Sequence, residues 1–357
     1  MSASSHSYPM SGGDDKHSYI HNSSYQKAGI DGVQEKARQY IFKNLDLLTM
    51  NPNLSTFTIA DFGCSIGPNT FHAVQNIIDI VKLKESQENS LVPLEFQVYF
   101  NDLPNNDFNT LFRTQPPSSK QDYFSVGVPG SFYGRVLPRN SIHLGNTSFT
   151  THWLSKVPEE VCDKKSPAWN KNYIHCNDLI EEVTEAYKVQ FTKDMRVFLK
   201  ARAEELVAGG LMIALGQCLP DGVAMYETWP GIVKDTIGDC LQDMATLGLT
   251  TEEKIEMFNL PVYFPQSSEL KGAIEQNKSF TIEMMEIVSH PLEAMQLSNN
   301  FVTSMYRAIL STVIEEHFGD SVVDELFRRF AKKLSKHPID FEKCKKQMVY
   351  HIVLKRK

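Results

Sequence analysis

The stretch FTIADFGCSIGPNT, residues 57–70, decides the fold class of this chain. A short apolar run with a β-branched residue at its centre stops at Asp61, and two glycines, Gly63 and Gly67, follow. This pattern indicates a buried strand that enters a glycine-rich turn. The next segment, TFHAVQNIIDIVKLK, has the apolar spacing of a helix that begins at the turn. Because glycine lets the backbone approach a ligand closely, strand, turn and helix together predict a nucleotide-type cofactor site.

The residues of the turn separate two kinds of cofactor. Dinucleotide-binding folds use G-x-G-x-x-G, whereas residues 63–69 here are GCSIGPN, so a cradle for the pyrophosphate of NAD is disfavoured. An acidic residue at the strand end, Asp61, suits the methionine ammonium of S-adenosylmethionine, directly or through a water. DFGCSIGPN is similar to the first motif of methyltransferases that use this cofactor. From the motif alone, an ordinary strand-turn-helix without a ligand is an equal interpretation.

The composition is that of a soluble globular protein. The chain has 357 residues, 41% hydrophobic and 22% charged, which is enough for one large domain or for a core with a cap. The 36 basic and 43 acidic residues give a formal net charge of −7, and the one dense basic run is KRK at the C-terminus. A nucleic-acid partner has little electrostatic support in such a chain, so we expect a small-molecule substrate.

The cysteines and the N-terminal residues bear on location. The cysteines are widely spaced and form no C-x-x-C pair, which favours reduced thiols in the cytoplasm. The first 27 residues contain no arginine and no apolar signal-peptide core, and no apolar run approaches membrane-spanning length. We therefore expect a cytoplasmic protein without membrane attachment. The cysteines are Cys64, Cys162, Cys176, Cys218, Cys240 and Cys344.

Strand patterns mostly separated by helical patterns predict an α/β fold, a doubly wound sheet with a helical cap. The expected strands are 57–62, 94–100, 142–149, 210–216, 279–286 and 347–355. We expect a lid segment and first helix in residues 1–50, a core formed by 51–216 and 279–357, and cap insertions at 154–200 and 217–340. A cap beyond the carboxyl ends of the strands would close over the cofactor and exclude water.

The second strand, LEFQVYF, is followed by Asp102, whose carboxylate could accept hydrogen bonds from both hydroxyls of an adenosine ribose. A surface turn is the alternative for Asp102. The interval from Asp61 to Asp102 is longer than the roughly 20 residues of dinucleotide folds, which again argues against NAD. Farther on, a turn at Pro129–Gly130 would expose Ser131 and Phe132 to an adenine, although an aromatic residue there could equally belong to the core.

Five separated motifs now carry a resemblance to one plant family. SYIHNSSYQ, ADFGCSIGPNTF, FNDLPNNDFNTLF, GVPGSFYGRVLP and THWLSKVP occur in the order and spacing of the SABATH methyltransferases, from about Met10 to the final strand. This family contains carboxyl methyltransferases of salicylate, benzoate, jasmonate, farnesoate and loganate, and the N-methyltransferases of the caffeine pathway. The resemblance implies S-adenosylmethionine as cofactor, a helical cap and a homodimer.

The resemblance also implies which residues hold the methyl donor. Polar groups of the glycine turn would bind its amino acid end, a carboxylate its ribose, and an aromatic ring with a hydroxyl its adenine. The implied positions are Tyr19, Asp61, Cys64, Asn69, Asp102, Leu103, Ser131 and Phe132.

For the acceptor, the resemblance points to Gln26 and Trp153, whose amide and indole N–H groups are neutral donors suited to a carboxylate. A carboxylic acid with a pKa of about 4 is ionised at neutral pH, so we expect no general base, and catalysis by positioning and desolvation. His152 could add a hydrogen bond or be structural, and Trp153 alone could be a core residue. The expected pocket wall is Phe149, Trp229, Val233, Met305 and Tyr306.

Some relatives bind magnesium near the acceptor through an Asn-Lys pair and an Asp-x-Phe-Asn run. The matching residues here are Asn170 in WNKN, and Glu256, Phe258 and Asn259 in EMFN. Glu stands where Asp is usual, so a loop held by hydrogen bonds is an equal interpretation of these residues.

The sequence therefore predicts a cytoplasmic plant enzyme that methylates the carboxylate of a small, mostly apolar acid and releases a methyl ester and S-adenosylhomocysteine. The motifs FNDLPNNDFN and QKAGIDG favour the farnesoate and loganate type. The alternatives are N-methylation of a purine alkaloid, a catalytically silent ligand-binding relative and an NAD oxidoreductase.

Overall fold

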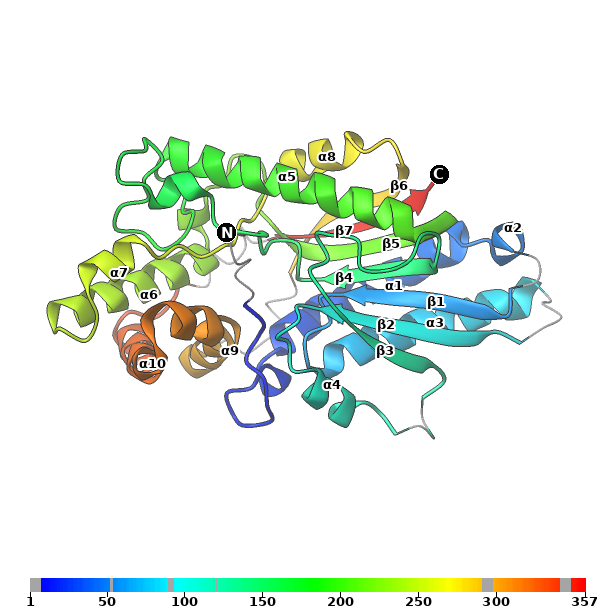
Figure 1. Ribbon diagram of the computed structural model, residues 1–357, viewed down its shortest axis with the longest axis horizontal. Helices are drawn as coiled ribbons and strands as arrows, with labels where there is room; N and C mark the ends of the chain where they lie inside the picture. The colour runs from blue at the N-terminus through cyan, green and yellow to red at the C-terminus, as the bar shows by residue number, and fades with distance from the viewer. Residues whose placement is uncertain are drawn as a thin grey trace.

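A seven-stranded sheet forms the centre of the molecule (Figure 1). The computed structural model describes residues 8–51, 54–88, 93–117, 119, 121–290, 298–340 and 348–357. Cys344 and residue 347 lie outside these ranges, and the other five cysteines are free thiols. In the described part of the chain, no helix is long and apolar enough to cross a membrane.

The strands are arranged in the order β3-β2-β1-β4-β5-β7-β6. Strands β1 to β5 are parallel, and β7 runs antiparallel to both β5 and β6. The bounds are β1 Thr56–Phe62, β2 Glu95–Asp102, β3 Phe124–Pro129, β4 Ile142–Ser148, β5 Leu206–Cys218, β6 Phe280–Ser289 and β7 Met348–Arg356. The α/β doubly wound class and all six expected strands are confirmed.

Strand β3 was missed because it lies at the edge of the sheet. Its sequence, FSVGVP, has no continuous apolar run, and Phe124 at its start is 63% exposed. An edge strand pairs on one side only, so it needs less apolar surface than a central strand.

Helices cover both faces of the sheet. Helices α1 Ser24–Asn44, α2 Leu47–Met50, α3 Pro68–Glu88 and α4 Phe108–Thr114 contribute to the core on one face, and α5 Glu181–Glu205 and α8 Ser267–Glu275 cover the other. As expected, α3 begins directly after the glycine turn. Pro68 is its first residue, a position where the missing N–H costs nothing, and its buried face includes Val74, Ile77, Ile78 and Val81.

A second helical group lies beyond the carboxyl ends of the parallel strands (Figure 1). It consists of α6 Trp229–Thr246, α7 Glu252–Glu256, α9 Asn299–Phe318 and α10 Asp320–Lys336, which share one apolar cluster with the start of α1. We call these four helices the cap. The short 3₁₀ helices are η1 Tyr19–His21, η3 Glu159–Cys162 and η4 Met225–Glu227.

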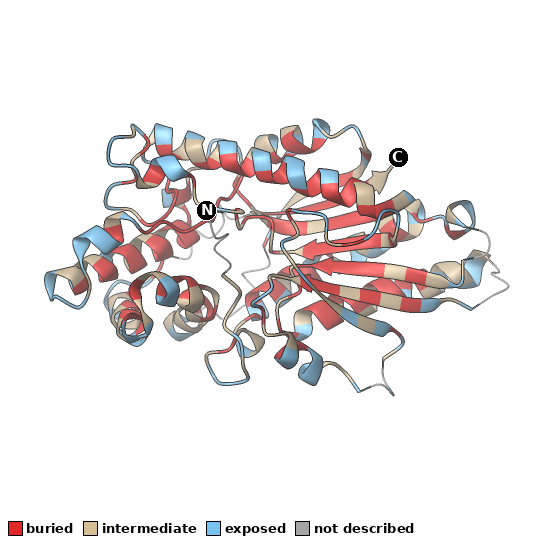
Figure 2. Cartoon of the chain, in the orientation of Figure 1, coloured by how far each residue is buried: buried red, intermediate tan, exposed pale blue. Residues whose placement is uncertain are grey.

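The expected cap insertions differ from this arrangement at two helices. α5, which begins within the insertion expected at residues 154–200, connects β4 to β5 and packs Tyr187, Phe191 and Phe198 against the sheet side of the core. Figure 2 shows its buried and exposed faces alternating along its length. α8, from the insertion at 217–340, packs on α5. Both helices are therefore layers of the core, because their apolar faces meet the sheet.

Candidate active site

The site lies where the strand order reverses, between β1 and β4, at the carboxyl ends of the strands. The turn after β1 is fixed by the protein itself, since the N–H groups of Gly63 and Cys64 donate to the Asn101 carbonyl at 2.8 and 3.0 Å. Gly63 has a φ of 80°, and a Cβ there would stand 2.2 Å from the Thr150 side chain. A side chain at residue 63 would collide with Thr150, so this position requires glycine. A Cβ at Gly67, by contrast, would have no neighbouring atom closer than 3.6 Å.

Asp61 joins three elements at this switch point. Its carboxylate is buried, and it accepts hydrogen bonds from the Thr70 hydroxyl at the start of α3 and from the Asn146 amide of β4, the latter at 2.7 Å. Burial raises the pKa of Asp61 to about 6, although the two hydrogen bonds oppose the shift. Through these two hydrogen bonds, Asp61 ties β1, α3 and β4 together.

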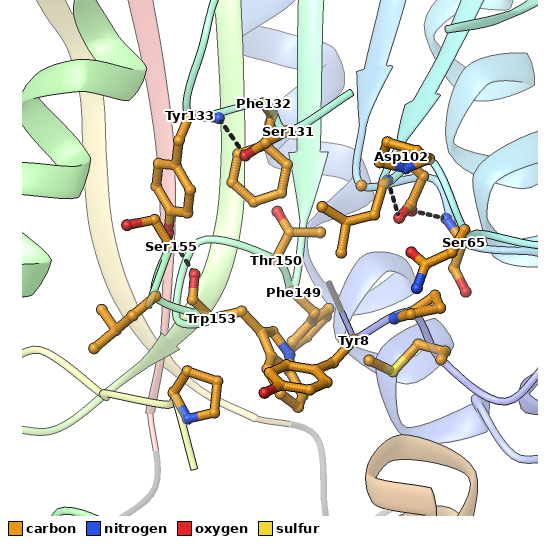
Figure 3. A pocket seen from close by; sticks show the side chains of 18 of the residues that line it. Tyr8, Ser65, Asp102, Ser131, Phe132, Tyr133, Phe149, Thr150, Trp153 and Ser155 are labelled. Atoms are coloured by element: carbon orange, nitrogen blue, oxygen red, sulfur yellow. Dashed lines mark hydrogen bonds between the residues drawn. The ribbon is translucent and has the colours of Figure 1, made fainter. Parts of the chain in front are cut away.

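Asp102 lies at the end of the neighbouring strand. Its two carboxylate oxygens accept the backbone N–H groups of Ser65 and Leu103, each at 2.7 Å (Figure 3). Ser65 has the left-handed φ of 51°, which is uncommon for a residue other than glycine. Burial raises the pKa of Asp102 to about 6. The Ser65 hydroxyl is buried and has no partner in the described part of the chain, so a polar group stands ready for a ligand.

A cavity of about 500 Å³ opens beside Asp102 (Figure 3). This volume suits a nucleoside-sized ligand. An adjoining pocket of about 30 Å³ shares Tyr19, Gly63 and Ser65 with it. Of the residues expected to bind the cofactor, Tyr19, Asp102, Leu103, Ser131 and Phe132 line the cavity, and Asp61, Cys64 and Asn69 line the adjoining pocket.

The wall at Phe132 is held by a buried ion pair that the sequence analysis missed. Arg202 and Glu205 on α5 are both 0% exposed, and Arg202 Nε donates to Glu205 at 2.7 Å. Arg202 also donates to the carbonyls of Phe132 and Gly134 at 2.7 and 2.9 Å. Glu205 accepts the N–H groups of residues 136 and 137. A charged pair three residues apart on the apolar face of a helix was the signal available in the sequence.

The N-terminal segment closes another side of the cavity. Tyr8 and Met10 line it, and the next residues reach both parts of the molecule. Ser11 donates its N–H to the Ala308 carbonyl of α9 at 2.9 Å, and Gly13 donates to the Asp107 carboxylate beside α4 at 3.0 Å. The segment therefore connects the cap to the core across the cavity.

A second chamber, of about 40 Å³, lies between the core and the cap. We call it the acceptor chamber. Trp153 lines both this chamber and the large cavity, and Gln26 lines both the chamber and the pocket at Asp61. Trp153 and Gln26 thus lie at the junction between the acceptor chamber and the two cavities at the strand ends. His152, Trp229, Met305 and Tyr306 also line the chamber, Phe149 lines the large cavity, and Val233 is absent from both linings.

Val233 is buried in the apolar cluster of the cap, and its neighbour Lys234 lines the chamber instead. A lysine on the apolar side of an otherwise core-facing helix was the sequence signal for this position. Three buried polar atoms of the chamber have no partner in the described part of the chain, namely Gln26 Oε1, His152 Nδ1 and Trp229 Nε1. Burial, with a contribution from Lys234, lowers the pKa of His152 to about 3, so its imidazole is neutral.

The residues expected to hold magnesium do not form a set of free oxygen ligands. Asn170 Nδ2 donates to Asn259 Oδ1 at 2.7 Å, and Glu256 is ion-paired to Lys164 at 2.5 Å. Phe258 is buried in the core of the cap. Of the two amide oxygens, this leaves Asn170 Oδ1 without a partner in the described part of the chain, whereas magnesium takes about six oxygen ligands with carboxylates among them. The residues present do not fit a magnesium ion, and they form a hydrogen-bonded loop.

Comparisons with known proteins agree with this geometry. The family model described as SAM dependent carboxyl methyltransferase matches residues 5–357. A probable S-adenosylmethionine-dependent methyltransferase of Arabidopsis thaliana is 91% identical, with 100% of each chain covered. Two more relatives from Arabidopsis thaliana are farnesoic acid carboxyl-O-methyltransferase, 44% identical over 98% of this chain and 99% of the relative, and paraxanthine methyltransferase 2, 42% identical over 97% and 98%.

A solved structure gives the same result. The chain superposes on loganic acid methyltransferase with S-adenosylhomocysteine at a TM-score of 0.92 and 42% identity, with 98% of this chain and 99% of the other covered. The resemblance found in the sequence motifs is therefore confirmed. The chain belongs to the family of S-adenosylmethionine-dependent carboxyl methyltransferases.

Proposed function

We propose that this protein methylates the carboxylate of a small acid and releases a methyl ester and S-adenosylhomocysteine. The observation that carries the proposal is the junction at Trp153 and Gln26, where the cavity and pocket at the strand ends meet the acceptor chamber. When bound, S-adenosylmethionine supplies a methyl group on a positively charged sulfur. The family description supports this cofactor.

The residues around the large cavity fit that cofactor. The Asp102 carboxylate would accept the ribose hydroxyls, Ser131 and Phe132 would contact the adenine, and Leu103 would complete the wall. The pocket residues Tyr19, Asp61, Cys64 and Asn69 would surround the amino acid end. The unpartnered Ser65 hydroxyl supports this assignment, because buried polar groups need partners.

The acceptor carboxylate would be oriented by Gln26 and Trp153. Both offer neutral N–H donors, which hold an oxygen in place without neutralising its charge. The acid arrives ionised, so no proton has to be removed, and the neutral, buried His152 is not required as a base. The site then has to place one carboxylate oxygen in line with the bond between the methyl carbon and the sulfur, and to exclude water. Phe149, Trp229, Met305 and Tyr306 would form the wall.

N-methylation of a purine alkaloid is the second candidate, because a paraxanthine methyltransferase is about as similar to the chain as the acid-methylating relatives. A buried lysine in the acceptor chamber favours an anionic acceptor over a neutral purine. A silent relative that binds ligands without turnover is the third candidate.

Three further expectations stay proposals. The division into lid, core and cap is supported by the separate apolar cluster of the cap and by the N-terminal contacts with α9. The homodimer rests on the resemblance to the plant family. The cytoplasmic location rests on the cysteine pattern, together with five free thiols.

The test is a panel of plant acids and methylxanthines incubated with purified protein and methyl-labelled S-adenosylmethionine, with products identified by mass spectrometry. We expect labelled methyl esters. Labelled N-methylxanthines without any ester would favour the second candidate, and cofactor binding without transfer to any compound would favour the third.

A further inference from the structure

Lys234, in the second turn of α6, is a buried cation in the acceptor chamber. It is 4% exposed and lines the chamber together with His152 and Phe264. Its Nζ atom lies 4.5 Å from the centroid of the Phe264 ring. Among the residues that the structure describes, Nζ forms no ion pair, and its one hydrogen-bond contact is the Met225 sulfur at 3.9 Å. Sulfur is a weak acceptor, so the ammonium has lost water without gaining an oxygen partner.

The acidic groups near Lys234 are committed to other donors. Asp235 accepts from His175 Nε2 at 3.0 Å. Asp178 accepts the backbone N–H of Met225 at 2.7 Å. Neither carboxylate forms an ion pair with Lys234, and burial lowers the pKa of Lys234 to about 8 even though both raise it. The protein therefore keeps a charge in the chamber without neutralising it by contact.

Lys234 does not line the cavities in which we propose that the methyl donor binds. Trp153 and Gln26 each line the acceptor chamber and one of the two cofactor-side cavities, whereas Lys234 lines the chamber alone. A carboxylate held at the junction would therefore leave the rest of the acid facing Lys234. The rest of the chamber lining is mainly apolar and includes Leu260, Val262, Met305, Ile309 and Leu310.

We propose that Lys234 binds a second carboxylate, so that the acceptor is a dicarboxylic acid and the product is its monomethyl ester. The inference rests on the proposed function. An oxygen of the carboxylate at the junction forms the new bond to the methyl carbon, the bond from methyl carbon to sulfur breaks, and its electron pair stays on sulfur. The distal carboxylate pairs with the Lys234 ammonium and is not methylated.

A charged distal group is favoured over a hydroxyl or carbonyl because of the surroundings. A single anion neutralises the ammonium in an apolar chamber, whereas a neutral acceptor leaves the charge uncompensated. The same argument gives specificity, since a monoacid would leave a buried ammonium unpaired.

The experiment uses matched pairs of acids that differ only at the distal end: adipic against hexanoic acid, suberic against octanoic acid, and terephthalic against para-methylbenzoic acid. Binding of each acid to the complex with S-adenosylhomocysteine is measured by calorimetry, and methyl transfer is measured with labelled cofactor. For at least one pair, we expect wild type to bind the diacid at least tenfold more tightly. Lys234→Met should abolish that preference while cofactor binding is unchanged, because Lys234 lines neither cofactor-side cavity.

The matched control is Ile309→Met, which changes the shape of the same chamber without changing its charge. This variant should affect both acids of a pair alike, so their ratio should stay as in wild type. If wild type binds no diacid more tightly than its matched monoacid, or if Lys234→Met keeps the preference, the assignment is wrong. Methyl esters of monoacids formed in that case would leave the proposed function standing, whereas transfer to no acid at all would contradict the proposed function itself.

Discussion

Arg202 and Lys234 are buried cations on consecutive helices, and they differ in the hydrogen-bond partners that surround them. Arg202 on α5 donates to Glu205 and to two backbone carbonyls at 2.7 to 2.9 Å, and its guanidinium lies 3.9 Å from the centre of the Phe62 ring. The Nζ atom of Lys234 on α6 instead lies 3.9 Å from the Met225 sulfur and over the face of the Phe264 ring. Both side chains are almost completely buried.

The difference distinguishes structural polar groups from groups that await a ligand. In the core, the fold supplies the partners of Arg202, and the pair then fixes the loop that forms one wall of the large cavity. In the acceptor chamber, Lys234, Gln26 Oε1 and His152 Nδ1 lack oxygen or nitrogen partners in the described part of the chain. Buried polar groups are nearly always satisfied in folded proteins, so a cluster of unsatisfied ones marks where substrate atoms belong.

The largest expected effect comes from breaking the satisfied pair. Arg202→Met leaves the Glu205 carboxylate buried without its cation, which should lower the free energy of unfolding by about 3–5 kcal/mol. It also releases the carbonyls of Phe132 and Gly134, so S-adenosylmethionine should bind more weakly. Urea unfolding and calorimetry measure the two effects, and Arg202→Lys, which keeps the charge, should lose less stability. A variant as stable as wild type would show that this pair does not hold the loop.

Removing the charge of Lys234 should raise the free energy of unfolding, whereas removing that of Arg202 should lower it. The pKa of Lys234 falls from 10.5 in the unfolded chain to about 8 in the folded protein, so below pH 8 folding pays for burying a charge. Lys234→Met should therefore raise the free energy of unfolding at neutral pH by roughly 3 kcal/mol. Between about pH 8 and 10.5 the unfolded chain holds the extra proton, so wild type should gain stability with rising pH and approach the variant.

Urea unfolding of both proteins across that pH range measures the difference. A variant that is less stable than wild type at neutral pH, or a difference independent of pH, would show that Lys234 is a structural residue like Arg202. The comparison between the two cations would then fail.

On the cofactor side, Asp102 tests whether a satisfied carboxylate can also serve a ligand. Asp102→Ala removes a charged acceptor for ribose hydroxyls and should weaken S-adenosylmethionine by about 1.5–3 kcal/mol, more than tenfold. Because Ser65 and Leu103 also donate to this carboxylate, Asp102→Asn is the control that keeps the shape and one acceptor oxygen. Calorimetry of the folded variants decides, and an unchanged dissociation constant for Asp102→Ala would remove the residue from the ribose role.

Variants at the junction between the acceptor chamber and the cavities at the strand ends should lower the rate of methyl transfer. Gln26→Ala and Trp153→Phe each remove one neutral donor, and each lost hydrogen bond is worth about 0.5–3 kcal/mol, so kcat/KM should fall tenfold or more. Cofactor affinity should change little. Since both donors act on one carboxylate, the double variant should lose less than the sum of the single losses. Wild-type efficiency in both single variants would return Trp153 to a packing role.

The sequence predicted the parts of the molecule that local patterns specify. The run ending at Asp61, the turn and α3 follow from apolar spacing and glycine, and some residues from each of the five motifs line neighbouring cavities. Long-range packing was harder to predict. Strand β3 lacks an apolar run, and α5 carries the same periodicity whether it packs on a sheet or on other helices. A period identifies the buried face of a helix but not what covers it.

The acceptor chamber shows the same limit at single residues. Val233 and Lys234 are adjacent on α6, and Val233 was expected in the pocket wall from its position in the cap, whereas Lys234 lines the chamber. One residue is a rotation of about 100° around a helix, and no local pattern in the cap fixes that angle. The charge of the chamber, and with it the class of acid that we propose, depends on this rotation.

The smallest expected effect concerns the loop at Asn170, which belongs with the satisfied groups. Because Asn170 and Asn259 bond to each other and Glu256 is paired with Lys164, adding a chelator should leave kcat/KM within about twofold, and magnesium should not raise the melting temperature. Asn170→Ala should cost about 0.5–1.5 kcal/mol of stability for each of the two amide hydrogen bonds that it removes, to Asn259 and to the His175 carbonyl, with or without magnesium. Activity that disappears with the chelator and returns with magnesium would place this loop with Lys234 instead, as a set of side chains that a ligand completes.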